Sequence, residues 1–226
     1  SPWQYDFPFT CHGAGTMMRI VDVDADGRLE VIISSHASLR ILDAATGRLK
    51  ARTTLPYDNM VELTTAQLGE KHLGRQIICS VNDHAYKPWD YSNPTMIFNS
   101  DLSLFREPFA VPGAGHFVVP IDVDDDGRDE LLIGYSLLDH DARTVLWALD
   151  MGKDYDYVEG HVDEICLSDF NGDGQLEIRY AGSENLYVAD LKGNILHTMH
   201  AGHAQTSLAG PLGPDGALRV ILCEKG

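Results

Sequence analysis

The chain has 226 residues, and its 34 Asp and Glu against 17 Lys and Arg give a formal net charge of −17. Such an acidic balance argues against nucleic acid as a partner. No run of about 18 apolar residues could span a membrane, and Ser1-Pro2-Trp3 is not a signal peptide, so any targeting segment is absent or already removed. No Pro-, Gly- or Ser-rich linker divides the chain, which we expect to form a single region over residues 1–226.

Short β-branched and apolar runs bounded by turn residues recur along the chain and predict strands. In chain order we expect them at 17–23, 29–35, 39–47 and 49–55; at 61–68, 76–81, 95–103 and 105–111; at 117–123, 130–135 and 144–152; at 164–170, 177–181, 185–193 and 195–200; and at 206–212 and 218–223. These groups define repeat units at about 12–58, 59–113, 114–159, 160–202 and 203–226, the last incomplete.

One acidic nine-residue string joins the first two strands of three units, at 22–30, 122–130 and 169–177. Positions 1, 3 and 5 offer side-chain oxygens, position 7 a backbone carbonyl and position 9 an acid, which together suit Ca²⁺. Glycine stands at position 6, where a turn with positive φ is expected. The string is not an EF-hand, because the acid falls at position 9 and strands flank it. We therefore expect three calcium sites, with these ligands: Asp22, Asp24, Asp26, Arg28 and Glu30; Asp122, Asp124, Asp126, Arg128 and Glu130; Asp169, Asn171, Asp173, Gln175 and Glu177.

An acidic surface turn without metal is the alternative for any single copy, but three copies in register favour calcium. The residues that open the second strand of each unit are Glu30, Gln76, Glu130, Glu177 and Arg219, and subtraction gives spacings of 46, 54, 47 and 42. The turns at 68–76 and 211–219 have lost the acids and should bind no metal.

A period of this size with about four strands per unit predicts an all-β fold, a β-propeller of four-stranded blades. The chain supplies four full blades and half of a fifth, and residues 1–10 could add at most one strand. We therefore expect a segment of four to five blades from a seven- or eight-bladed propeller. A closed ring of five blades is the alternative.

The cysteines do not form a disulfide pattern. Cys79, Cys166 and Cys223 fall in predicted strands of different blades, which favours buried thiols. Cys11 stands beside His12, and with another histidine the pair could form a Zn²⁺ site.

Histidines mark one face of the predicted propeller. His12, His116, His161 and His203 lie just ahead of first strands, and the last three follow glycine. First strands run from that end toward the acidic turns, so the loops between second and third strands should share the histidine face. Those loops carry His36, Asp83, His84, Tyr86, Lys87, Trp89, Tyr91, Tyr135, His140 and Arg143. Calcium on the opposite face is then structural. The alternative is that each Gly-His pair only packs neighbouring blades.

The acidic strings resemble FG-GAP or VCBS propeller repeats, also seen in integrin α-chain heads, and the resemblance covers nearly the whole chain. The Gly-His pairs and Gly202-His-Ala-Gln205 resemble the propeller polysaccharide lyases that cleave ulvan, rhamnogalacturonan or rhamnose-glucuronate linkages. This second resemblance implies β-elimination on a uronic acid: the carboxylate is neutralised, a His or Tyr removes the C5 proton, and a Tyr or His protonates the leaving oxygen.

The lyase resemblance implies roles for several residues. His116 and His161 are candidates for neutraliser or base, Tyr86 and Tyr135 for acid or base, and Lys87 and Arg143 for carboxylate partner. The remaining candidates for substrate binding are His12, His36, His84, Trp89, Tyr91, His140, His203 and Gln205. The expected partner is a polysaccharide, and the expected location is secreted, periplasmic or cell-surface. Two alternatives remain: a non-catalytic lectin or adhesion propeller, and a structural repeat segment.

Overall fold

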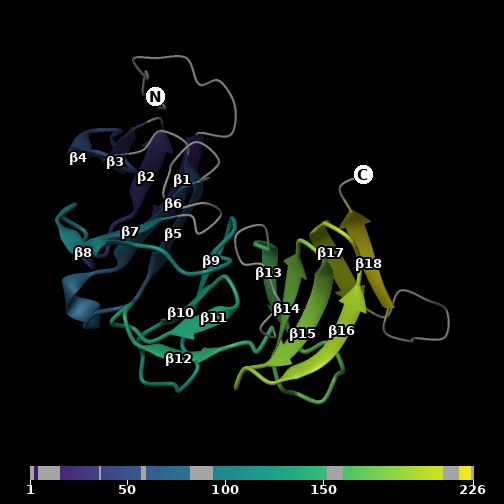
Figure 1. Cartoon of the computed structure of the whole chain (residues 1–226). Helices are drawn as coiled ribbons and strands as arrows, with labels where there is room; N and C mark the ends of the chain where they lie inside the picture. Colours follow the sequence, from purple (N-terminus) through teal and green to yellow (C-terminus); the bar gives the residue numbers. More distant parts are fainter. Residues whose placement is uncertain are drawn as a thin grey trace.

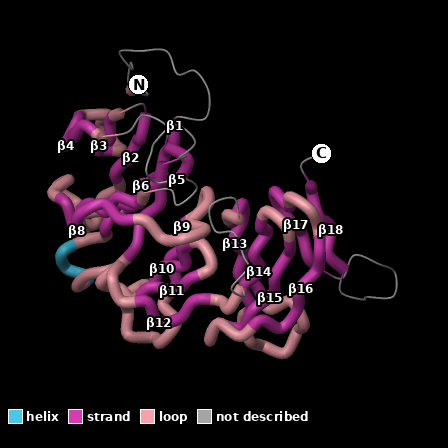
Figure 2. Tube along the Cα trace, in the orientation of Figure 1, coloured by secondary structure: helices cyan, strands magenta, loops and turns pink. Residues whose placement is uncertain are grey.

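The structure of the chain, a computed structural model, describes residues 3–4, 16–35, 37–56, 60–81, 94–151, 160–210 and 219–224. Within these ranges the chain is built almost entirely of strands, and the short turn η1 (Lys71–Leu73), cyan in Figure 2, is its only helical element. No helix among the described residues has the length and apolar character that crossing a bilayer requires.

The strands form antiparallel meanders that follow chain order, and Figure 1 shows them succeeding one another around an arc. The four-stranded sheets are β1 (Thr16–Val21), β2 (Glu30–Ser35), β3 (Ser38–Asp43) and β4 (Leu49–Thr54); β5 (Met60–Ala66), β6 (Gln76–Val81), β7 (Thr95–Phe98) and β8 (Leu104–Phe109); β9 (Val118–Ile121), β10 (Glu130–Ile133), β11 (Ser136–Leu138) and β12 (Val145–Ala148); and β13 (Val162–Ser168), β14 (Glu177–Gly182), β15 (Asn185–Asp190) and β16 (Ile195–His200). β17 (Ala204–Gly210) and β18 (Arg219–Glu224) pair alone.

These sheets are blades of a partial β-propeller, as the sequence predicts. The first strands lie innermost, with β1 beside β5, β5 beside β9, and β13 beside β17. The second strands begin at the five predicted residues, from Glu30 in β2 to Arg219 in β18. The described residues make four complete blades and the two-stranded start of a fifth.

The hydrophobic core lies between blades. Three of its clusters each contain residues of two successive blades: Ile41 and Ile77 share the first, Ile97 and Leu131 the second, and Leu132 and Ile178 the third. β2 and β14 are buried at every residue, because each is covered on both faces, whereas β16 is exposed throughout. Inter-blade burial therefore holds the propeller together.

The start of each second strand is tied back to the end of the first by its own side chain. The carboxylate at position 9 accepts a hydrogen bond from the backbone N–H of position 2: Glu30 from Val23 (3.0 Å), Glu130 from Val123 (2.9 Å) and Glu177 from Phe170 (2.8 Å). In the second blade, Gln76 Oε1 accepts from Leu68 N–H at 2.8 Å. Because this hydrogen bond also forms with the neutral amide of Gln76, the turn can close without a metal.

The third blade departs from the predicted strands. Its third strand is β11, and the run expected to be third, 144–152, instead contains the fourth strand β12. The chain turns sharply after Ile133, where Gly134 has a φ of +56° and a Cβ would lie 2.8–2.9 Å from backbone atoms of residues 112 and 113. The sequence reading missed this tight turn, and the displacement moves two predicted site residues.

The expectation of buried thiols holds for one cysteine of the three that are described. Cys79 is buried, Cys166 is half-buried and Cys223 is exposed. Cys223 lies in β18, which has no outer strands beside it among the described residues, so nothing there covers its thiol.

Two tryptophans make the same contact on two blades. Trp147, in the outer strand β12, donates its indole N–H to Leu191 O (3.0 Å) and lies against Gly193 in the next blade. Trp3 donates to Ala44 O (2.8 Å) and lies against Gly47 of the first blade. Trp3 thus stands where the outer strand of a blade preceding the first would lie.

Candidate functional site

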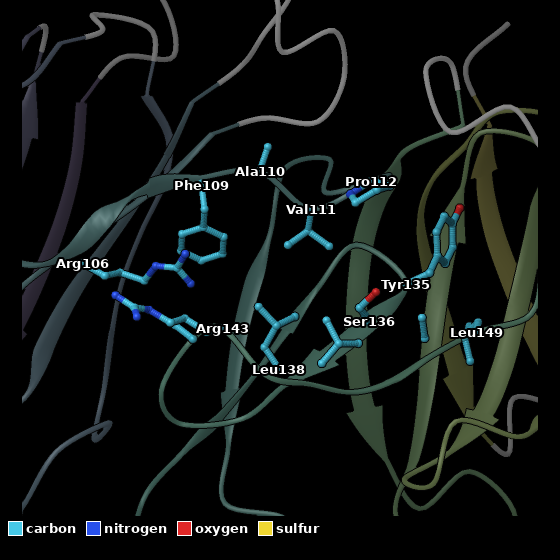
Figure 3. A pocket seen from close by; sticks show the side chains of 13 residues that line it. Arg106, Phe109, Ala110, Val111, Pro112, Tyr135, Ser136, Leu138, Arg143 and Leu149 are labelled. Atoms are coloured by element: carbon cyan, nitrogen blue, oxygen red, sulfur yellow. The ribbon is translucent and has the colours of Figure 1, made fainter.

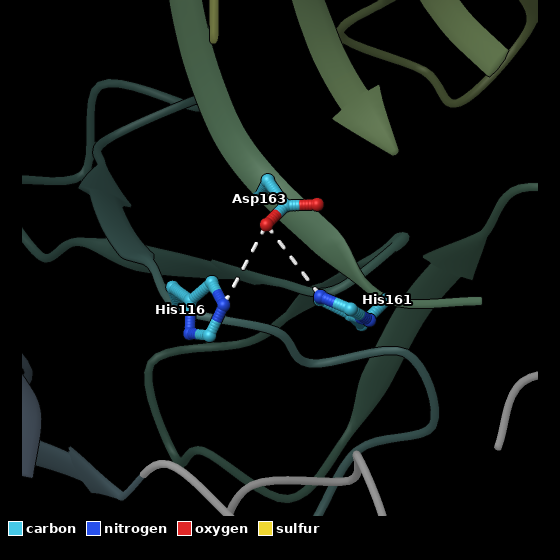
Figure 4. Close-up of side chains that lie close together, drawn as sticks. All are labelled: His116, His161 and Asp163. Atoms are coloured by element: carbon cyan, nitrogen blue, oxygen red, sulfur yellow. Dashed lines mark ion pairs between the residues drawn. The ribbon is translucent and has the colours of Figure 1, made fainter. Parts of the chain in front are cut away.

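The described histidines that precede first strands converge on one carboxylate, Asp163 in β13. His203 Nε2 lies 3.0 Å from Asp163 Oδ2, while His161 Nε2 and His116 Nε2 lie 3.5 and 3.6 Å from Oδ1. Figure 4 shows His116 and His161 pointing toward this carboxylate from either side. The imidazole rings stack edge to face, with centroids 5.3 Å apart for His116 and His161 and again for His161 and His203. We call these four residues the histidine cluster.

The blade repeat builds this cluster. His161 directly precedes β13, His203 directly precedes β17, and His116 lies two residues ahead of β9. Because neighbouring first strands lie beside one another, residues at their starts meet at the propeller mouth. The acidic loops follow the other ends of these strands, as Asp169 follows β13, so the cluster and the loops lie at opposite ends.

Backbone contacts between the third and fourth blades fix two of the imidazoles. His116 N–H donates to Val162 O and Val162 N–H donates to Gly113 O, both at 3.1 Å. Between them, Gly115 has a φ of +60°, and a Cβ there would lie 1.7 Å from Val162 O. Only glycine allows this approach.

Hydrogen bonds with Ser183 and Tyr135 hold His161 in place. Ser183 Oγ accepts a hydrogen bond from His161 N–H (3.1 Å) and lies 3.2 Å from its Nδ1. Tyr135 donates its hydroxyl to His161 O at 3.5 Å. These contacts leave Nε2 facing Asp163 and set the orientation of the ring.

The carboxylate is buried and its outer histidines are accessible. The Asp163 side chain is 3% exposed and that of His161 8%, whereas His116 and His203 are 27% and 31% exposed. Gln205 Nε2 donates to Asp163 Oδ1 at 2.9 Å. Burying a carboxylate is costly unless it is hydrogen-bonded or paired, and Gln205 and the three imidazoles surround Asp163.

The cluster also has the ligands of a metal site. One nitrogen each from His116 and His161 and one oxygen from Asp163 lie within 4.8 Å of one another. Imidazole and carboxylate ligands suit Zn²⁺, so the residues fit the expected metal. Cys11 and His12, the residues expected to hold zinc, lie outside the described residues.

The acidic loops have three groups of converging carboxylates. Asp22, Asp24 and Glu30 form one, Asp122, Asp124 and Glu130 the second, and Asp169, Asp173 and Glu177 the third. Each loop is shaped by the same bonds: the position 1 carboxylate accepts from the N–H groups of positions 5 and 6. The second and third loops fit calcium, whereas the first already contacts the ammonium of Lys50.

Tyr135 is not an accessible acid or base. Its side chain is 1% exposed and packs against Tyr180 and Tyr187 in the core between the third and fourth blades. The expectation of a catalytic hydroxyl at this position is therefore corrected. The Tyr135 hydroxyl instead donates a hydrogen bond to the backbone carbonyl of His161.

His140 and Arg143 lie away from the predicted histidine face, because the early turn at Gly134 places both between β11 and β12. His140 Nδ1 lies 2.6 Å from Asp139 Oδ1 and its Nε2 lies 2.8 Å from Arg128 Nη1, beside the second acidic loop. Arg143 lines a separate cavity of about 520 Å³ between the second and third blades, where Figure 3 shows it next to Arg106.

The structure brings together His116, His161, His203 and Gln205 among the predicted residues. The others on this face, together with Cys11 and Asp83, fall outside the described residues: His12, His36, His84, Tyr86, Lys87, Trp89 and Tyr91. Sequence reasoning missed Asp163 and Ser183. The pattern His161-Val-Asp163 carried a signal for the first, since alternate residues of an extended chain share a face, as do His203 and Gln205.

No protein-family model matches the sequence, and no curated protein matches it. Solved structures do share the fold. The exotype rhamnogalacturonan lyase YesX superposes with a TM-score of 0.68 at 18% identity, over 94% of this chain and 43% of that one. Rhamnogalacturonan lyase YesW gives 0.67 at 17%, over 93% and 44%. The Bacillus licheniformis rhamnogalacturonan lyase PL11 gives 0.65 at 16%, over 93% and 44%.

The chain thus spans less than half the length of these lyases. At this identity the likeness shows the fold, a β-propeller of the kind found in rhamnogalacturonan lyases.

The junction that seats His116 gives a first prediction. Gly115→Ala should lower the free energy of unfolding by more than the roughly 1–3 kcal/mol of backbone strain alone, because the new Cβ also separates the third and fourth blades. Urea unfolding measures the change. The matched control is Gly172→Ala, where φ is +78° and a Cβ would meet nothing within 4 Å. Equal losses in the two variants would contradict the inter-blade role of Gly115.

Proposed function

We propose that this protein is a polysaccharide lyase that cleaves a uronic-acid-containing glycan by β-elimination, with the histidine cluster as its active site. The observation that carries the proposal is the convergence of three imidazoles on the buried Asp163 at the mouth of a propeller. The shared fold with rhamnogalacturonan lyases supports the same reaction class.

β-Elimination needs a group that neutralises the uronate carboxylate and a base that reaches the C5 proton. The substrate carboxylate must be neutralised so that the C5 proton becomes acidic, and a base must then remove it. The electron pair left at C5 forms the C4–C5 double bond while the C4–O bond breaks, and the leaving oxygen takes up a proton. Imidazole serves as base when neutral and as cation when protonated.

The geometry assigns these roles among the accessible histidines. His203 lies nearest to Asp163, at 3.0 Å, and its side chain is 31% exposed, so we assign it to contact the uronate carboxylate. His116, at 3.6 Å and less tightly paired, is the neutral base. His161 is buried and oriented by Ser183, which makes it a positioning residue. If His116, His161 and Asp163 held a metal instead, the metal would supply positive charge toward the uronate carboxylate, and His116 would not be the base.

The remaining elements of the proposal are structural calcium and an extracellular location. The second and third acidic loops hold calcium as FG-GAP-like repeats, at the end of the blades away from the cluster. Calcium there stabilises the turns and takes no part in the chemistry. The protein acts as a secreted, periplasmic or cell-surface enzyme, where polysaccharide is met.

The reaction is tested by following the ultraviolet absorbance of the unsaturated uronate product with rhamnogalacturonan and other uronic-acid polymers. His116→Ala should lower kcat by about 10²–10⁴-fold, the usual contribution of a general base. His72→Ala is the control, because the His72 side chain is 70% exposed in η1, where it pairs with Glu70. Retention of polysaccharide without any unsaturated product would instead favour the lectin alternative. An unchanged kcat in His116→Ala would remove His116 as the base.

Calcium is tested through stability. A site filled at 100 times its Kd adds about 2.7 kcal/mol to the free energy of unfolding, so chelation should lower the Tm by several degrees and calcium should restore it. Differential scanning calorimetry with calcium, and with magnesium as the control ion, measures the effect. Asp124→Asn, which places in the second loop the residue type found at position 3 of the third, should reduce the gain. Equal Tm values with calcium and with chelator would refute structural calcium.

A further inference from the structure

The first acidic loop contains a cation supplied by the chain itself. Lys50, in the outer strand β4, places its Nζ 2.7 Å from Asp24 Oδ2 and 2.7 Å from Glu30 Oε1, with Asp26 Oδ2 at 3.9 Å. These carboxylates occupy positions 3, 9 and 5 of the loop, three of the places expected to ligate calcium.

The corresponding places in the third and fourth blades hold leucine. Lys50 lies in a bulge between the pairs Leu42–Leu49 and Ile41–Ala51. The same bulge recurs between Leu138–Val145 and Leu137–Trp147, where Leu146 stands, and between Ala189–Ile195 and Val188–His197, where Leu196 stands. Leu196 lines one cavity with Asn171 and Glu177 of the third loop, just as Lys50 lies against the first.

The second loop has Leu146, not a lysine, at the bulge position that Lys50 occupies beside the first. One oxygen each from Asp122, Asp124 and Glu130 lie within 4.8 Å of one another there. The Arg128 guanidinium binds Asp126 Oδ2 (2.7 Å) on the outer side and contacts His140. The described residues place no cation between Asp124 and Glu130.

The third loop uses a neutral group at the same place. Asn171 donates its Nδ2 to Asp173 Oδ2 and to Glu177 Oε1, both at 3.0 Å. Rotation of the amide would present its oxygen to a cation with little movement of the loop. Both loops can therefore accept calcium without displacing a charge.

An ammonium and a calcium ion compete for the same oxygens. Calcium binds carboxylate oxygens at about 2.3–2.6 Å, so it cannot enter the first loop while Lys50 donates to Asp24 and Glu30. Taking up calcium would also leave the Lys50 ammonium without its two hydrogen bonds to carboxylates, which is costly for a charged group. Lys50, tethered in β4, is present at every calcium concentration.

We propose that Lys50 takes the place of calcium in the first acidic loop, so that this chain binds two calcium ions, in the second and third loops, and not three. The inference rests on the proposed calcium binding of those two loops. It makes the first blade independent of calcium while the third and fourth depend on it.

Native mass spectrometry and calcium titration of the intact chain test the proposal. The wild type should bind two calcium ions, and Lys50→Met should bind a third with at least tenfold higher affinity than the first loop of the wild type. Leu196→Lys should reverse this effect in the fourth blade and leave a single ion. Lys192→Met is the control: Lys192 lies in the turn before β16, is exposed, and should leave the count at two.

The possible outcomes distinguish the role of Lys50 from calcium binding by the second and third loops. Three ions of similar affinity in the wild type, or a third loop that still binds calcium in Leu196→Lys, would overturn the role of Lys50. No calcium in the wild type but one ion in Lys50→Met would refute calcium at the other loops and still support the lysine. Far-UV circular dichroism in the presence of calcium confirms that both variants fold.

Discussion

The structure depends on one hydrogen bond that is repeated in each complete blade. The side chain that opens the second strand accepts a bond from the backbone N–H just past the end of the first strand, as Glu177 does from Phe170. Because the acceptor is buried, the bond fixes both the length of the turn and the register of the two strands. Gln76 makes it without charge, which separates the folding role of this position from any role in binding metal.

With the turn fixed at one end of the blade, the other end becomes the place where residues from different blades can meet. The first strands of neighbouring blades lie near one another around the propeller axis. Residues at the same distance along these strands from the turn therefore converge. His161 and His203 both directly precede their first strands, and Asp163 lies between them because β13 is the middle strand of the three that contribute. A site of this kind needs no long loop: a small shift along the strand decides which side chains reach the centre.

Charge is distributed in keeping with that arrangement. The chain carries a net charge of −17, yet its acids concentrate in the turns at the far end of the blades. The histidine cluster contains a single carboxylate, and that carboxylate is already paired. The more exposed side chains of the cluster are therefore imidazoles, those of His116 and His203. In the first acidic loop, too, carboxylates are paired by a residue of the chain itself, Lys50.

The sequence by itself determined the all-β repeat, the blade period and the positions where second strands begin, because these depend on local alternation and on turn residues such as Gly27 and Gly174. It also indicated a shared histidine face. Only the tertiary structure decided which residues form the site. Asp163, one of two adjacent acids in β13, becomes the centre because three blades place imidazoles around it. Tyr135 is buried in the core, and the turn at Gly134 places His140 away from the histidine cluster. The burial of Tyr135 and the position of this turn depend on contacts between blades, which no local sequence pattern encodes.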